Sequence, residues 1–161
     1  MFEMIEAFAA FAEKSAIAEA IRFSRWSYSI VNTAHVLGIA ILVGAVLPMD
    51  LRLMGVWGRD VDRTAVVRLL MPFAAAGLAL ALIAGAMLFT VRAGNYVQAT
   101  LLYWKLGVVA LGCGMALMFH ARAGIWGERA GDGRAVFHGA ASLACWLGAL
   151  VMGRFIAYFP Y

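Results

Sequence analysis

Charged side chains are scarce in this chain. Only 14% of its 161 residues are Asp, Glu, Lys or Arg, whereas 65% are hydrophobic, and the mean hydropathy is +0.86. A soluble domain of this size would need a more polar surface. The composition therefore argues against a soluble fold and predicts a membrane protein in contact with a lipid bilayer.

Cysteine is also rare, and its scarcity excludes another class of protein. The two cysteines, Cys113 and Cys145, both lie in the middle of apolar segments, where a disulfide would close no loop. A disulfide-stabilised scaffold is therefore excluded, and the cysteines do not indicate the redox state of the compartment.

Clustered positive charge and enzyme motifs are missing as well. The formal net charge is +4, but the 13 Lys and Arg residues are spread over the termini and loops, which argues against nucleic-acid binding. The apolar segments contain no nucleophile beside a base, no phosphate-binding loop and no pair of carboxylates. We therefore predict that the chain is no hydrolase or kinase, has no catalytic residues and has no catalytic activity of its own.

Four long apolar segments dominate what the sequence does contain. Residues 28–48, 69–91, 101–121 and 135–158 each have about the length of helix that crosses roughly 30 Å of hydrocarbon. Small residues at four-residue spacing favour close helix contacts in these segments. They include Ala34 and Gly38, Ala40 and Gly44, Ala110 and Gly114, and Ala140, Ala144 and Gly148. The sequence predicts an all-α fold, a four-helix transmembrane bundle in one domain over residues 1–161.

The segment before the first span has a different pattern. It carries acidic residues where a cleavable signal carries basic ones, so we expect the mature chain to begin at Met1. Apolar residues recur in it at helical spacing, namely Phe2, Ile5, Phe8, Ala9, Ala12 and Ala16. Residues 1–26 are therefore predicted to form an amphipathic surface segment, with a second short turn that starts at Ser15.

Four spans place both termini on one side of the membrane, here called the terminal side. The loops, residues 50–68 and 122–134, then share the other side, here called the loop side. Seven Lys and Arg residues belong to the loop side and six to the terminal side. The positive-inside rule therefore places the loops in the cytoplasm and the termini outside.

The three histidines are the main chemical signal. His35 lies inside the first span, His120 near the end of the third and His138 just inside the fourth. Ionisable residues at such depths are functional candidates by default. If the third and fourth spans are antiparallel neighbours, His120 and His138 lie at one depth. Cys113 and Cys145, each two turns from a histidine, then lie together roughly 10 Å deeper.

The fourth span extends this pattern along one stripe, which consists of His138, Ser142, Cys145, Ala149 and Met152. A bundle interior lined with His, Cys and Met suits haem or a soft metal ion. The candidate metal ligands are His35, His120, His138, Cys113, Cys145 and Met152.

Each candidate also has a purely structural interpretation. The cysteines and Met152 are then core packing, and His120 and His138 are interface residues in contact with water. His35 would be satisfied by a hydrogen bond to another helix. If it is instead a ligand, Asn32, one turn away, can orient its ring.

Several stretches of the chain are similar to an uncharacterised bacterial family of small four-span membrane proteins. They are VNTAHVLGIAILVGAVLPMDLRLMG (31–55), FTVRAGNY (89–96), MFHARAGIW (118–126) and GRFIAYF (153–159). The likeness covers nearly the whole chain and carries no known activity. A histidine followed by an apolar, Gly-rich half-span also resembles, over one helix, the membrane portion of copper-resistance D proteins and of small b-type cytochromes. The resemblance implies a bacterial inner-membrane location and interest in His35 and His120.

These features predict a redox protein that binds haem b for electron transfer within the membrane. His120 and His138 are the expected ligands on grounds of depth, whereas a site at His35 would need another partner, such as Met152. The expected electron partner is a quinone or another membrane or periplasmic redox protein, and a homo-oligomer is compatible with the sequence. The alternatives are a copper-handling protein that passes Cu(I) along the His, Cys and Met side chains, and a cofactor-free accessory subunit of a larger membrane complex.

Overall fold

The computed structural model describes residues 2–156 and 158. Met1, residue 157 of the predicted fourth span, and residues 159–161 lie outside the described residues. Within the described part every regular element is a helix, which confirms the predicted all-α fold. The helices are α1 (Phe2–Glu13), α2 (Ala16–Phe23), α3 (Arg25–Leu53), α4 (Arg63–Val91), α5 (Ala93–Tyr96), α6 (Thr100–Ala123) and α7 (Asp132–Ile156).

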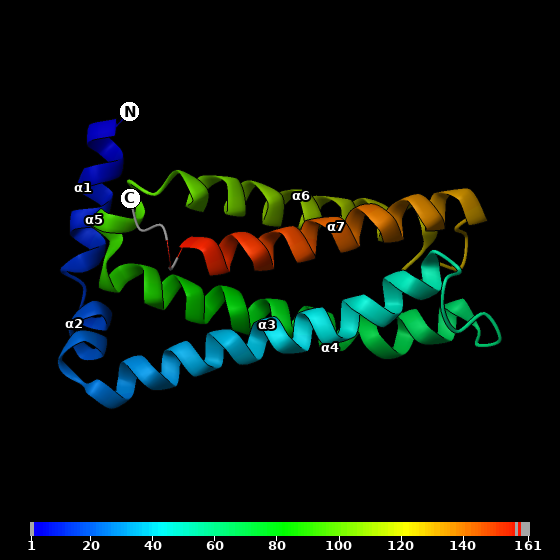
Figure 1. The fold of residues 1–161 in the computed structure, drawn as a ribbon, viewed down its shortest axis with the longest axis horizontal. Helices are drawn as coiled ribbons and strands as arrows, with labels where there is room; N and C mark the ends of the chain where they lie inside the picture. Colours follow the sequence, from blue (N-terminus) through cyan, green and yellow to red (C-terminus); the bar gives the residue numbers. More distant parts are fainter. Residues whose placement is uncertain (1, 157, 159–161) are drawn as a thin grey trace.

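The long helices α3, α4, α6 and α7 lie side by side along the long axis of the molecule (Figure 1). All four are long and apolar enough to cross a membrane, and they correspond to the four predicted spans. Helix α1 and the end of α7 lie at one end of the bundle, whereas the loops 54–62 and 124–131 lie at the other. The chain is therefore a multi-pass membrane protein with a terminal side and a loop side.

The helices extend beyond the predicted spans. Helix α3 continues through Pro48 to Leu53, and α4 begins at Arg63, directly after its N-cap residue Asp62. Proline is tolerated inside transmembrane helices because neighbouring groups compensate for the lost backbone hydrogen bond. The expectation that a loop begins at Asp50 is therefore wrong, since this residue belongs to the last turn of α3.

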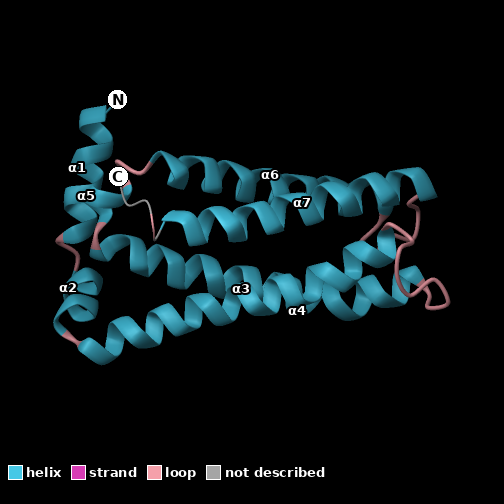
Figure 2. Cartoon of the chain, viewed as in Figure 1, coloured by secondary structure: helices cyan, strands magenta, loops and turns pink. Residues whose placement is uncertain are grey.

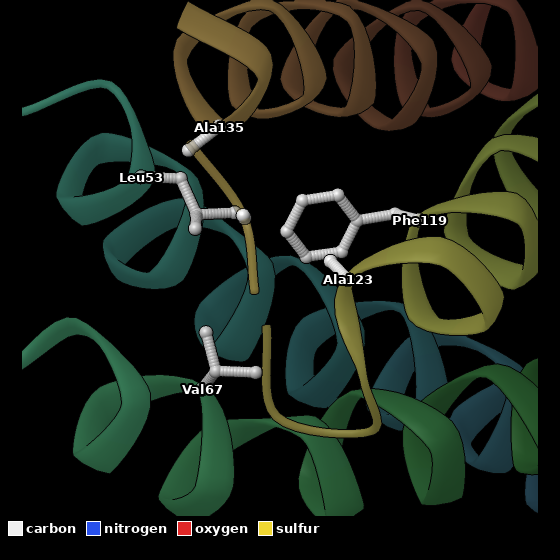
Figure 3. Packing of buried hydrophobic residues seen from close by; sticks show 6 residues of the cluster. Leu53, Val67, Phe119, Ala123 and Ala135 are labelled. Carbon is white, nitrogen blue, oxygen red and sulfur yellow. The ribbon is translucent and has the colours of Figure 1, made fainter. Parts of the chain in front are cut away.

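Helices α3 and α7 are central in the bundle. Helix α3 packs against α4 and α7, and α7 packs against α3 and α6, so the helices are connected in the order α4, α3, α7, α6. At the loop side one cluster of buried residues joins all four helices (Figure 3). Its members include Leu53 of α3, Val67 of α4, Phe119 and Ala123 of α6, and Ala135 of α7. The loop side is therefore the end of the bundle where the four spans converge.

The contact between α3 and α4 depends on glycine. A Cβ atom added to Gly38 would lie 2.5 Å from the amide nitrogen of Ala81. One added to Gly77 would lie 2.5 Å from the amide nitrogen of Leu42. No side chain fits at such distances, so Gly38 makes the close helix contact that its spacing predicts. A Cβ added to Gly44 would meet nothing within 4 Å, so this glycine does not take part in the helix contact.

The amino-terminal segment lies across the terminal end of the bundle (Figure 2). It forms two helices, and the second begins directly after Ser15, whose hydroxyl accepts a hydrogen bond from the Ala18 amide at 3.2 Å. The Arg22 guanidinium donates to the carbonyl oxygens of Glu13 at 3.3 Å and Val91 at 3.1 Å. Arg22 thereby connects the end of α1 to the end of α4.

Candidate functional site

His120 of α6 and His138 of α7 meet at one aromatic side chain near the loop side. The ring of Phe119 stacks on His138, with centroids 4.1 Å apart and planes at 12°. The same ring meets His120 edge to face, with a centroid distance of 5.6 Å. Adjacent antiparallel helices thus bring the two predicted histidines to one place. Sequence reasoning did not identify Phe119, because a phenylalanine in an apolar run carries no signal of its own.

Neither imidazole has a hydrogen-bond partner among the described residues. The Nδ1 atom of His120 is buried without a hydrogen-bond partner, and His138 forms no hydrogen bond with another described residue. A buried polar atom without a partner typically costs about 1–3 kcal/mol. The pair is therefore available to a ligand that the chain itself does not supply.

Asp50 is a second polar group in this half of the bundle, and the sequence analysis missed it. Its exposed fraction is 0%, and neither carboxylate oxygen has a hydrogen-bond partner among the described residues. The signal was present, because Leu42, Val46 and Leu53 share its face of α3 at helical spacing and all are buried. An acidic residue at this position of an apolar stripe indicates a buried carboxyl and not the start of a loop.

Ser142 of α7 faces this carboxyl. It is 5% exposed, and it and Asp50 are the only buried polar side chains in the described part of the chain. The serine lies near the carboxyl, but neither carboxylate oxygen forms a hydrogen bond with it. The carboxyl is therefore buried beside one polar side chain and forms no hydrogen bond in the described chain.

His35 differs from the other two histidines because it has a partner. Its Nδ1 lies 2.7 Å from the carbonyl oxygen of Ala81 in α4, and a carbonyl only accepts, so Nδ1 carries the proton. The ring also lies against α4 at Gly85, where an added Cβ would stand 2.9 Å from the imidazole Cε1. Asn32, the predicted orienting group, is exposed. The alternative of a hydrogen bond to another helix is the arrangement found for His35.

The sulfur-containing candidates pack in the bundle. Cys113 is half-buried, Cys145 is 8% exposed, and both are free thiols. An added Cβ at Gly112 would lie 3.4 Å from the Cβ of Cys145, so this cysteine faces α6. Met152 is half-buried on α7. Among the described residues, no three His, Cys, Asp or Glu side chains lie close enough together to hold a metal ion.

Two apolar grooves lie elsewhere on the molecule. One is lined by Ile17, Ala20, Ile21, Ser27, Ile30, Val31 and Met87, and the other by Ala40, Ile41, Gly44, Ala45, Leu70 and Phe73. Neither groove includes a histidine or Asp50. Both grooves are thus lined almost entirely by apolar side chains and contain none of the candidate ligands.

A scan against models of protein families, a search of curated proteins and a search of solved structures each found no match to this chain. Its function is therefore inferred from its own residues.

Proposed function

We propose that this multi-pass membrane protein binds one haem b through His120 and His138 and transfers electrons within the bacterial inner membrane. The observation that carries the proposal is the meeting of two half-buried imidazoles from adjacent helices, neither of which forms a hydrogen bond with another described residue. Neutral imidazole is a common axial ligand of haem iron, and haem when bound would supply the one-electron chemistry.

Phe119 is a neighbour that both proposed ligands contact. This ring lies against the face of His138 and belongs to the buried cluster at the loop side (Figure 3). His120 and His138 would hold the haem iron through ring nitrogens, which lie in the imidazole planes, so the stacking of Phe119 on the face of His138 does not by itself block ligation. His35 takes no part in this site, because it lies deeper in the bundle, on the face of α3 that contacts Ala81 and Gly85 of α4.

Absorption spectroscopy tests the haem site. Protein purified in mild detergent from haem-sufficient cells should be red, with a Soret band that sharpens and shifts on reduction. His120→Ala and His138→Ala should each abolish the low-spin spectrum, because six-coordinate iron needs both imidazoles. His35→Ala is the matched control, since it also removes a half-buried imidazole, and it should leave the spectrum nearly intact.

Two outcomes would contradict this assignment. A preparation that stays colourless after addition of hemin would remove haem from the proposal. Loss of haem in His35→Ala, together with its retention in His138→Ala, would move the site toward the middle of the membrane. Met152 would then be the second ligand to test.

Copper handling is the second candidate, and one observation favours it. The α7 stripe that runs from His138 to Met152 faces the bundle interior, since Ser142, Cys145 and Ala149 are all buried. Free thiols select soft ions such as Cu(I). Metal analysis of the purified protein should then find copper, and Cys113→Ser with Cys145→Ser should remove it. Protein with neither haem nor copper would support the cofactor-free accessory subunit.

The exposed surface of the spans bears on how an electron partner would reach the site. Large apolar side chains such as Leu37, Phe73 and Leu117 are exposed along the spans, as expected for surfaces that face lipid. A quinone could therefore approach from the bilayer, and a membrane or periplasmic redox protein could dock at either end. The excess of one basic residue on the loop side supports cytoplasmic loops and periplasmic termini.

A further inference from the structure

Asp50 is a buried ionisable side chain that the proposed haem site does not use. It lies one turn before Leu53 of the loop-side cluster (Figure 3), where α3 meets α7. No part of the residue is accessible to solvent, and neither carboxylate oxygen has a hydrogen-bond partner in the described chain. A carboxyl in these surroundings needs either a counter-ion or a proton.

The arginines near the loop side do not supply a counter-ion. Arg52, on the same helix, donates to the Val61 carbonyl at 2.7 Å. Arg63 of α4 donates to the Ala130 carbonyl at 2.7 Å and forms a salt bridge with Asp132 at 3.2 Å. Each of these cations is thus directed to a partner other than Asp50.

The other loop-side cations do not supply a counter-ion either. Arg59 donates to the Gly55 carbonyl, and Arg122, Arg129 and Arg134 are exposed. Arg68 of α4 lies over the ring of Trp126, 5.8 Å from its centroid. His120 of α6 and His138 of α7 contact Phe119, and neither forms a hydrogen bond with the carboxyl. Ser142, which is uncharged, is the polar side chain that faces Asp50 from α7.

An ionised carboxylate without a counter-ion is strongly disfavoured in an apolar interior, whereas the protonated acid is neutral. We propose that Asp50 is a proton-binding site, protonated in the closed bundle, which releases its proton to loop-side water when α3 and α7 separate. The carboxyl O–H bond breaks in that step, and a water molecule accepts the proton. The proposal goes beyond haem binding and does not depend on it, because it requires no cofactor.

The contact between α3 and α7 explains why release requires movement. A Cβ atom added to Gly139 of α7 would lie 2.8 Å from the carbonyl oxygen of Asp50 and 3.1 Å from the Cβ of Leu53. The two helices therefore touch at the backbone of Asp50, and the side chain of this residue is not accessible to solvent.

Infrared spectroscopy of the protein in ether-lipid vesicles, which contain no ester carbonyls, tests the proposal. A protonated carboxyl has a carbonyl stretching band that an ionised carboxylate lacks. At neutral pH we expect one such aspartate band, because the other aspartates, Asp60, Asp62 and Asp132, are exposed. Labelling of aspartate carboxyl groups with carbon-13 should shift this band, which assigns it to aspartate without any substitution.

The variants identify the residue. Asp50→Asn, which preserves the size of the side chain, should remove the band completely, whereas Asp132→Asn is the matched control and should leave it unchanged. In deuterated buffer the band of the native protein should shift, because the proton exchanges whenever α3 and α7 separate.

The outcomes separate this proposal from the haem proposal. Absence of a labelled aspartate band in the folded native protein would mean that Asp50 is ionised and would overturn the inference. A band that never shifts in deuterated buffer would also overturn it, because Asp50 would then be a permanently neutral structural group. A colourless protein with an exchanging aspartate band would refute haem binding alone.

Discussion

Replacing Gly38 with alanine should destabilise the bundle, whereas replacing Gly44 with alanine in the same helix should not. The new methyl group at Gly38 would stand 2.5 Å from the Ala81 amide nitrogen and 2.8 Å from the Gly77 carbonyl oxygen. Both neighbours are backbone atoms, so no side chain can move aside. Helices α3 and α4 would therefore have to separate along their main contact.

The expected loss has two parts. Overpacking of a tight interface usually costs about 1–3 kcal/mol. Separation of the helices would also weaken the hydrogen bond between His35 and the Ala81 carbonyl, and such bonds contribute about 0.5–1.5 kcal/mol. We therefore expect the free energy of unfolding of Gly38→Ala to be lower than that of Gly44→Ala by about 2–4 kcal/mol.

Gly44→Ala is the matched control because a Cβ there would meet nothing within 4 Å. Both substitutions gain the same intrinsic helix propensity, roughly 1 kcal/mol for glycine to alanine, so their difference isolates the helix contact. The assay is reversible unfolding in mixed micelles with increasing sodium dodecyl sulfate, followed by tryptophan fluorescence. Equal free energies of unfolding for the two variants would refute the role of Gly38 in holding α3 against α4.

The remaining predictions concern the loop side. Asp132→Asn should leave the free energy of unfolding nearly unchanged in the same assay, because this carboxylate is 98% exposed and its salt bridge is screened by water. Arg63→Gln should cost more, about 1 kcal/mol, because it also removes the hydrogen bond to the Ala130 carbonyl; equal effects of the two substitutions would contradict this distinction. Cysteine-accessibility labels near Gly58 and Gly131 should both react from the cytoplasm, and labels at the chain ends only from outside. Reaction of the two loops from opposite faces of the membrane would contradict the four-span arrangement.

The spans could be predicted from sequence because apolar length is a local property. Each of the four apolar segments became a long helix, and the antiparallel packing of α6 against α7 brought His120 and His138 to one aromatic ring. Helix ends were harder to predict, since Pro48 does not interrupt α3. Because the end of α3 was placed too early, Asp50 was assigned to a loop. Its spacing from Leu42 and Val46 instead indicates the buried face of α3.

The partners of individual side chains could not be predicted in the same way. The hydrogen bond of His35 to Ala81 depends on where α3 crosses α4, and two glycines determine that crossing. A single sequence shows Gly38 and Gly77 as small residues but not that they face each other, because many small residues in these spans have no such contact. Contacts between helices could therefore be identified only in the three-dimensional structure, whereas the helices themselves could be predicted from the sequence.

The buried side-chain polar atoms that lack hydrogen-bond partners in the described part of the chain belong to Asp50 and His120, which lie in the same half of the bundle. Asp50, His120 and His138 belong to the last or first two turns of their helices at the loop side, whereas His35, deeper in the bundle, is hydrogen-bonded to a neighbouring helix. A ligand or proton that satisfies them has its shortest route from the loop side. The orientation of the chain therefore determines the compartment with which Asp50 exchanges its proton. With cytoplasmic loops, that proton comes from the cytoplasm, and acidification of the outer compartment alone should leave the Asp50 band unchanged.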